Sequence, residues 1–183
     1  MEDNRMRVIL AEKPSVAQSI AAVLGADQKK NGYLQGENDL VSWCIGHLIE
    51  LAPPEIYDAR YAKWRREDLP IVPSAWESVV SDGTKKQFAV LKDLLNRTDV
   101  DEVVCATDAG REGELIFRMV YEKTGCTKPV KRLWISSLEE SAIREGFRSL
   151  KPGTAYVPMW NGYLASRKKK RNGKKEKSRE KDN

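Results

Sequence analysis

The chain has 183 residues, enough for one domain with a hydrophobic core and too few to predict two. With 40% hydrophobic and 32% charged residues it should be globular, and no apolar run approaches the roughly 20 residues of a membrane span. The net charge of +5 is concentrated near the end, because residues 167–183 hold ten basic and three acidic residues and the first 166 hold 22 basic and 24 acidic ones.

A strand and a helix are predicted at the start of the chain. The run "MRVILAE" (6–12) is apolar and partly β-branched, as in a buried strand, and it places Glu12 at the strand's carboxyl end. In the following "KPSVAQSIAAVLG", Ser15 and Gln18 have the spacing of a capping box, and Gly25 can end the helix. The N-terminus lacks the basic start and apolar middle of a signal peptide, so a cytoplasmic location is expected.

The middle of the chain alternates between short strands, irregular structure and a helix. Turn signals in residues 31–54 separate short strand-like runs. Residues 55–82 are rich in Pro, Trp and Tyr without clear periodicity, which predicts an ordered excursion. Helical spacing returns in "TKKQFAVLKDLLNR" (84–97), where four large apolar residues share one face.

The second half of the chain alternates strands and helices. "DEVVCAT" (101–107) is a predicted buried strand and "GELIFRMVYEKTG" (113–125) a helix. "PVKRLWIS" (129–136) is a third predicted strand, and "SLEESAIREGFRSL" (137–150) is a helix that starts with capping-box spacing. This order predicts an α/β fold with a parallel sheet and right-handed crossovers.

The three cysteines and the single histidine are too few and too far apart to predict structural zinc. Cys44, Cys105 and Cys126 include no closely spaced pair, whereas a structural site usually needs four such ligands. The cysteines are therefore interpreted as packed thiols. His47 is interpreted as a structural residue near the core, because a lone histidine needs a partner to act in catalysis.

The segment "CATDAGREGE" (105–114) concentrates charge directly behind a buried strand. In open α/β sheets, chemistry gathers beyond the carboxyl ends of the strands. If the strands that end at Glu12 and Asp108 are neighbours, these two carboxylates and Glu112 converge on one rim. A divalent cation relieves the repulsion between them. Oxygen ligands without histidine or cysteine suit Mg²⁺, which takes one or two carboxylates together with phosphate.

Two cations beside these acids extend the predicted site to phosphate. Lys13 and Arg111 can hold phosphate oxygens, Arg111 bidentately, so Mg²⁺ and a phosphate backbone would bind together. A structural interpretation stays open, because Asp108 can cap the next helix and Glu12 can be a solvated loop residue. Acids at a helix N-terminus are in any case stabilising by ~0.3–1 kcal/mol. Neither G-x-x-x-x-G-K-[ST] nor G-x-G-x-x-G is present to support a nucleotide-binding loop.

Four segments resemble, in order, the N-terminal Toprim domain of bacterial DNA topoisomerase III, a type IA topoisomerase. They are "LAEKPSVAQSIAAVLG", "GHLIELAPP", "ATDAGREGELIFR" and "RLWISSLEESAIREGF". The resemblance covers about residues 6–155, and four ordered motifs are far more specific than the acid cluster alone. It implies a Toprim domain over residues 1–155, with a Rossmann-like, mostly parallel central sheet flanked by helices.

The resemblance also implies a role for each candidate residue. In that family, Toprim acids hold Mg²⁺ and assist transesterification, while a tyrosine of another domain attacks single-stranded DNA and a strand passes through the break without ATP. Glu12 would be a metal ligand and the general acid for the leaving 3′-hydroxyl, and Asp108 a metal ligand. Lys13 and Arg111 would steady the scissile phosphate of the DNA partner.

The sequence departs from the family pattern in two ways. The second Asp of the family's Asp-x-Asp motif is Gly110 here, and Glu112 is the nearest replacement ligand. Gly110 and Gly113 are otherwise interpreted as residues that allow a tight turn. The family chain also continues for several hundred residues, and none of the six tyrosines here lies in a match to its nucleophile segment. This chain alone is expected to be inactive, with the missing C-terminal topoisomerase domains as partners.

Agreement with the family ends near residue 155, and residues 156–183 are expected to form a divergent, basic, disordered tail. A truncated or frame-shifted gene is the expected origin of the break. The predicted DNA contacts in the tail, through phosphate charge, are Lys168, Lys169, Lys170 and Arg171. A merely solvated end is the alternative for the tail, and a non-catalytic nucleic-acid-binding Toprim module is the alternative for the whole chain.

Two further expectations concern reaction class and aromatic residues. Toprim domains also occur in primases, small nucleases and recombination mediator proteins, but the "GHLIELAPP" and "RLWISSLEESAIREGF" matches argue against these. Trp43 and Trp134 fall in strand-like runs and are predicted to be core residues. Trp64, in "KWRRED", is the strongest candidate for stacking on a base.

Overall fold

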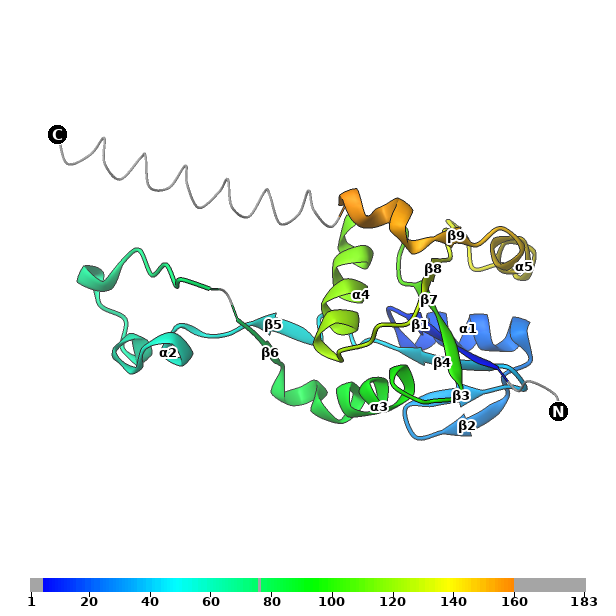
Figure 1. Cartoon of the computed structure of the whole chain (residues 1–183), viewed down its shortest axis with the longest axis horizontal. Coiled ribbons are helices and arrows are strands. Elements are labelled where there is room, and N and C mark those ends of the chain that lie inside the picture. The colour runs from blue at the N-terminus through cyan, green and yellow to red at the C-terminus, as the bar shows by residue number, and fades with distance from the viewer. Residues whose placement is uncertain (1–4, 76, 160–183) are drawn as a thin grey trace.

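The computed structural model describes residues 5–75 and 77–159, and a seven-stranded sheet lies at its centre (Figure 1). The strands are β1 (Met6–Ala11), β2 (Gln28–Lys30), β3 (Tyr33–Gln35), β4 (Asp39–Trp43), β7 (Val100–Ala106), β8 (Val130–Arg132) and β9 (Lys151–Pro152). Their order is β2-β3-β4-β1-β7-β8-β9. The central four, β4, β1, β7 and β8, pair in parallel, and the outer strands pair antiparallel. The α/β fold class predicted from the sequence is confirmed.

Helices cover both faces of the sheet. The helices are α1 (Pro14–Leu24), α3 (Lys85–Leu95), α4 (Arg111–Lys123) and α5 (Glu140–Arg148). Because side chains alternate along a strand, β1 serves two cores at once. Val8 and Leu10 pack with residues of α3 and α4, whereas Ile9 and Ala11 pack with residues of α1 and α5. An apolar run without alternation is what a strand buried on both faces requires.

A separate arm leaves the sheet between β4 and α3 (Figure 1). It contains a two-stranded sheet, β5 (Ile49–Leu51) with β6 (Ser78–Val80), and between them the short helix α2 (Pro54–Tyr57) and the 3₁₀ turns η1 (Ala59–Ala62) and η2 (Arg66–Asp68). The described residues of the excursion expected at 55–82, which are 55–75 and 77–82, include short helical turns and the strand β6. Trp64 lies on this arm with 78% of its surface exposed, as a stacking residue would require.

The predicted strand 129–136 is too long at its carboxyl end. β9 pairs only with Lys131 and Arg132, and β7 ends at Ala106. Beyond Arg132, Leu133 still donates its N–H to the Cys105 carbonyl at 3.0 Å, but the strand pairing has ended. Trp134 is 39% exposed and stacks on Tyr156 with ring centroids 4.9 Å apart, so the prediction that it is a core residue is wrong.

The predicted helix starts also differ from the structure. Pro14 is the first residue of α1, which leaves Lys13 at the N-cap and Ser15 inside the helix, so no capping box forms there. The Ser137 hydroxyl accepts the Glu139 N–H at 3.2 Å, so α5 starts at Glu140 without the predicted box. Helix α4 starts two residues before the predicted 113, at Arg111, because an extended Gly110 forms its N-cap.

The three cysteines are buried and free, which confirms them as packed thiols. Burial raises the pKa of the Cys105 thiol to about 11 and that of Cys44 well above its ordinary value. Both thiols therefore stay protonated at neutral pH. Within the described residues, no helix is long and apolar enough to cross a membrane.

Stability is expected to decline at alkaline pH because of the Cys105 thiol. The unfolded chain releases this proton near pH 9.0, whereas the folded protein keeps it until about 11. The contribution of this thiol to the free energy of unfolding is therefore complete below pH 9. It is lost as the pH rises, by at most ~1.4 kcal/mol per pH unit for one thiol. Urea unfolding from pH 8 to 11 should show a shallower decline in Cys105→Ala than in the wild type. An identical decline would contradict this assignment.

Candidate metal and phosphate site

The parallel pairing brings the carboxyl ends of four strands to one edge of the sheet. β1 and β7 are neighbours, and Ala11 is paired with Ala106 at their ends. Glu12 and Asp108 follow these two residues within two positions. The condition on which the predicted site depended, adjacency of the two strands, is met.

Glu12 and Asp108 are joined directly. The Glu12 side chain is largely buried, with the residue 9% exposed, and its Oε2 accepts the backbone N–H of Asp108 at 3.2 Å. Asp108 itself is exposed to solvent. One carboxylate is thus held in place under the turn, and the other stands at its surface, where a ligand can reach it.

Glu112 does not complete a group of three carboxylates. Its Oε1 lies 2.5 Å from His47 Nε2, and both side chains are exposed. Among residues 5–75 and 77–159, no three His, Cys, Asp or Glu side chains are grouped closely enough to hold a metal ion. The pairing arises because β4 is parallel to β1, so the turn at Gly46, with φ 58°, carries His47 to the same edge.

His47 also lies at the carboxyl edge of the sheet, which was not expected from the sequence. It was expected near the core, but its side chain is 44% exposed. The signal available in the sequence was its position just after a strand, which matches the positions of Glu12 and Asp108 after theirs.

The two predicted phosphate ligands stand at helix starts on this edge. Lys13 is the N-cap of α1, and Arg111 is the first residue of α4. Both are exposed, and neither has an ion pair with another described residue. Backbone N–H groups and the helix dipole at such positions also favour anions. The predicted tail contacts Lys168, Lys169, Lys170 and Arg171 lie outside the described residues.

A buried charge network holds the turn that carries Asp108. Arg132 is 1% exposed, and its Nη1 donates to the carbonyls of Cys105 (2.9 Å) and Thr107 (2.7 Å), while Nη2 donates to that of Asp108 (2.7 Å). Arg132 Nε has no hydrogen bond but lies 3.4 Å from Glu114 Oε2, and Arg118 Nε donates to Glu114 Oε1 at 2.8 Å. Arg132 therefore holds the backbone from Cys105 to Asp108, where β7 leads into the turn.

This buried network was not predicted from the sequence. Glu114 lies in the first turn of α4, where an acid is favourable in any case, but it is 1% exposed and bonds to Arg118. The sequence did contain an indication of it, because each of the two residues interrupts an apolar segment. Arg132 lies within a predicted strand, and Glu114 directly precedes the apolar "LIF". Charged side chains are almost never fully buried unless they are paired.

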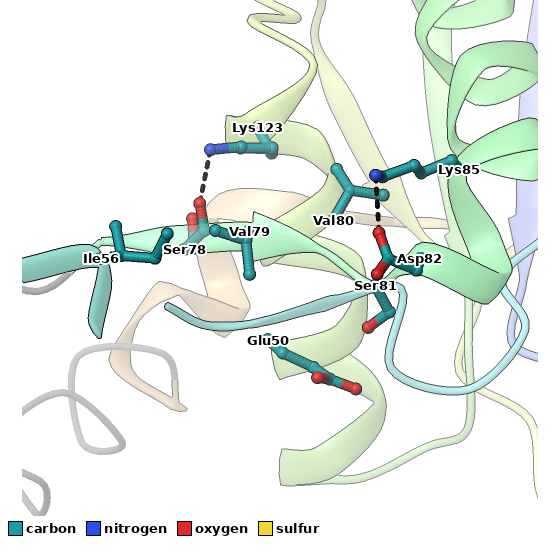
Figure 2. Close-up of a pocket in the computed structure, with 9 residues that line it drawn as sticks. All are labelled: Glu50, Ile56, Ser78, Val79, Val80, Ser81, Asp82, Lys85 and Lys123. Carbon is teal, nitrogen blue, oxygen red and sulfur yellow. Dashed lines mark hydrogen bonds and ion pairs between the residues drawn. The ribbon is translucent and has the colours of Figure 1, made fainter. Parts of the chain in front are cut away.

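Two cavities are relevant to ligand binding. One, of about 540 Å³, lies at the root of the arm (Figure 2). Its two lysines are engaged, because Lys123 donates to the Ser78 carbonyl at 2.6 Å and Lys85 pairs with Asp82 at 2.6 Å. The other, of about 300 Å³, borders Asp108 at the carboxyl edge of the sheet.

The donor set at this edge fits Mg²⁺ better than a transition metal. Glu12 and Asp108 offer carboxylate oxygens, the three thiols are buried, and the imidazole of His47 is paired with Glu112. Mg²⁺ commonly takes one or two carboxylates and fills its other positions with water and substrate phosphate. Two protein carboxylates with a phosphate are sufficient for such a site, and Glu112 is not required.

The fold and this edge together define a Toprim-type α/β domain. Residues 7–138 match the family described as the Toprim domain, and the chain belongs to that family. Within it, the chain is similar to DNA topoisomerase 3, with 54% identity to the protein of Bacillus thuringiensis (strain Al Hakam) over 158 residues. It is 52% identical to that of Shouchella clausii (strain KSM-K16) over 156 residues.

These alignments cover most of this chain and a small part of each relative. They include 86% of the chain and 22% of the B. thuringiensis protein, and 85% and 21% for S. clausii. The chain thus spans about a fifth of the length of the curated relatives it matches. The full-length topoisomerase I of Thermotoga maritima shares the fold over 79% of this chain, with a TM-score of 0.53 and 23% identity.

Proposed function

We propose that this chain is the Mg²⁺-binding, DNA-phosphate-handling Toprim part of a type IA DNA topoisomerase III. The observation that supports this most is the pair of adjoining strand ends, with Glu12 bonded to the Asp108 backbone. Beside them lie Lys13 and Arg111, neither of which has an ion pair among the described residues. The relatives that it matches are named DNA topoisomerase 3, and they are far longer. Domains outside this sequence would supply the tyrosine nucleophile.

Each residue at the edge would have a distinct task. Glu12 and Asp108 would hold Mg²⁺, which when bound neutralises charge on phosphate oxygens. Lys13 and Arg111 would bind the phosphate of a single strand, and Arg111 can do so bidentately. In its protonated form, Glu12 would also be the general acid for the leaving 3′-hydroxyl. Its buried carboxylate is already oriented by the Asp108 N–H.

Mg²⁺ binding is the direct test of the site. Titration followed by NMR should give saturable shifts at Glu12 and over residues 107–112, and these should vanish in Asp108→Ala. Asp82→Ala removes an exposed aspartate outside the edge and should leave the titration unchanged. Gly110→Asp should tighten binding several-fold, because a Cβ at Gly110 meets no atom within 4 Å and the residue is extended. Identical, diffuse shifts in the wild type and Asp108→Ala would exclude the site.

The polypeptide alone is expected not to relax supercoiled plasmid DNA in the presence of Mg²⁺. The reason is chemical, since strand passage needs a covalent tyrosine intermediate and no tyrosine here lies in the matching segment. Gel analysis after incubation should show the starting topoisomer distribution. Relaxed topoisomers that disappear in Asp108→Ala would show that this chain carries the complete activity.

A non-catalytic nucleic-acid-binding module remains the second candidate, because Lys13 and Arg111 are exposed and free of ion pairs within the described chain. This function predicts salt-dependent binding of single-stranded DNA that does not respond to Mg²⁺ or to Asp108→Ala. Binding that Mg²⁺ strengthens favours the topoisomerase assignment.

A further inference from the structure

The cavity of about 300 Å³ at the carboxyl edge shares Asp108 with the proposed metal and phosphate site, and its other lining residues have no assigned role there. It lies between the start of α1, the turn after β7 and the segment that joins β8 to α5. Its size is at the lower end of the usual range for small-ligand pockets, about 300–1,000 Å³. It can therefore hold one small, compact group.

The lining of this cavity is apolar with hydroxyl groups at its rim. Val16, Ile135 and Leu138 form the apolar part. Val16 and Ile135 are partly buried and pack against the core between the sheet, α1 and α5, so these walls are firm. Gly146 allows this packing, since a Cβ there would lie 2.6 Å from Ile135 Cγ2.

The hydroxyl groups are available to a ligand. Ser136 is exposed and makes no hydrogen bond with other described residues. The Ser137 hydroxyl accepts the Glu139 N–H and keeps its own hydrogen to donate. Thr107, by contrast, is committed to the Gly113 carbonyl at 2.7 Å.

Without a cation on Asp108, the charge of the lining disfavours phosphate as the occupant. Of the described residues that line the cavity, Asp108 is the only charged one, and no lysine or arginine is among them. An anion would meet only a carboxylate here. A flat, uncharged group with polar edges fits the walls and hydroxyls better, and a nucleobase is such a group.

We propose that this cavity is a nucleobase subsite, which takes the base adjacent to the phosphate held at Asp108. The inference rests on the proposed function, because that function supplies the DNA strand. The apolar walls would contact the faces of the base, and the Ser136 and Ser137 hydroxyls would bond its polar edge. DNA binding would then depend on one base as well as on phosphates.

A single abasic position in a single-stranded oligonucleotide separates base binding from phosphate binding. With Mg²⁺ present, fluorescence anisotropy should show that moving the abasic site along the strand weakens binding about tenfold at one position. Val16→Phe fills the cavity and should remove this dependence, with intact and abasic strands bound equally. Val23→Phe, on the same helix and outside the cavity, is the control, and its DNA binding should still weaken when the abasic site is at that position.

Leu138→Ser serves as a second variant if Val16→Phe does not fold, because Leu138 is 47% exposed. Leu138→Ser should also reduce the loss of affinity that the abasic site causes at this position. Equal binding of all abasic strands by the wild type, or an unchanged penalty in the variants, would overturn the subsite and leave the phosphate site intact. Failure of the wild type to bind any strand would overturn the proposed function and the subsite with it.

Discussion

Replacing Arg132 with leucine is expected to lower the free energy of unfolding by about 3–5 kcal/mol, the usual cost of removing one partner of a buried charge pair. The change removes the Arg132 donors from the carbonyls of Cys105, Thr107 and Asp108. It also leaves Arg118 as the one cation paired with Glu114 among the described residues. A buried carbonyl that loses its donor adds its own desolvation penalty. Urea denaturation followed by circular dichroism measures the loss.

Lys131→Leu is the matched control, because Lys131 is the preceding residue of β8 and its pair with Glu102 is partly exposed. It should cost less than about 1 kcal/mol. A double variant, Arg132→Leu with Glu114→Gln, should be less destabilised than the two single changes added together, since it removes both charges of one pair. If Arg132→Leu costs no more than Lys131→Leu, the network does not hold the turn.

Gly113→Ala should disrupt the turn that presents Asp108. An added Cβ at this position would lie 2.1 Å from the Asp108 carbonyl oxygen and 2.9 Å from its nitrogen. These are backbone atoms, which cannot move aside as the end of a flexible side chain can. The start of α4 must therefore move away from the turn at Asp108. We expect a loss of stability of about 1–3 kcal/mol, as for other overpacked sites, and a loss of the Mg²⁺-dependent NMR shifts at Glu12.

Gly110→Ala is the matched control for this prediction. The two glycines are three residues apart, and no atom lies within 4 Å of a Cβ added at Gly110. Its φ of 172° is extended backbone that any residue adopts. The interpretation that both glycines are needed for a tight turn therefore holds for Gly113 alone. Equal effects of the two alanines would show that close packing against Asp108 is not what requires the glycine.

The outline of the fold could be predicted because it depends on local patterns. The apolar runs at 6–12 and 101–107 are β1 and β7, and helical spacing located α1, α3, α4 and α5. The ends of the strands and helices were predicted less accurately, because the end of an element depends on which other elements lie beside it. β8 stops at Arg132, where its pairing with β9 also ends, and no residue pattern within 129–136 indicates that limit.

The candidate site divides in the same way between sequence and tertiary structure. The sequence by itself determined that Glu12 and Asp108 end buried strands, because alternation and apolar runs are local properties of the chain. Only the tertiary structure decided that Glu112 meets His47, 65 positions away, and that Arg132 reaches the carbonyls around Asp108. Such pairings depend on strand order and on the direction in which each turn carries a side chain, and neither is encoded in the spacing of neighbouring residues.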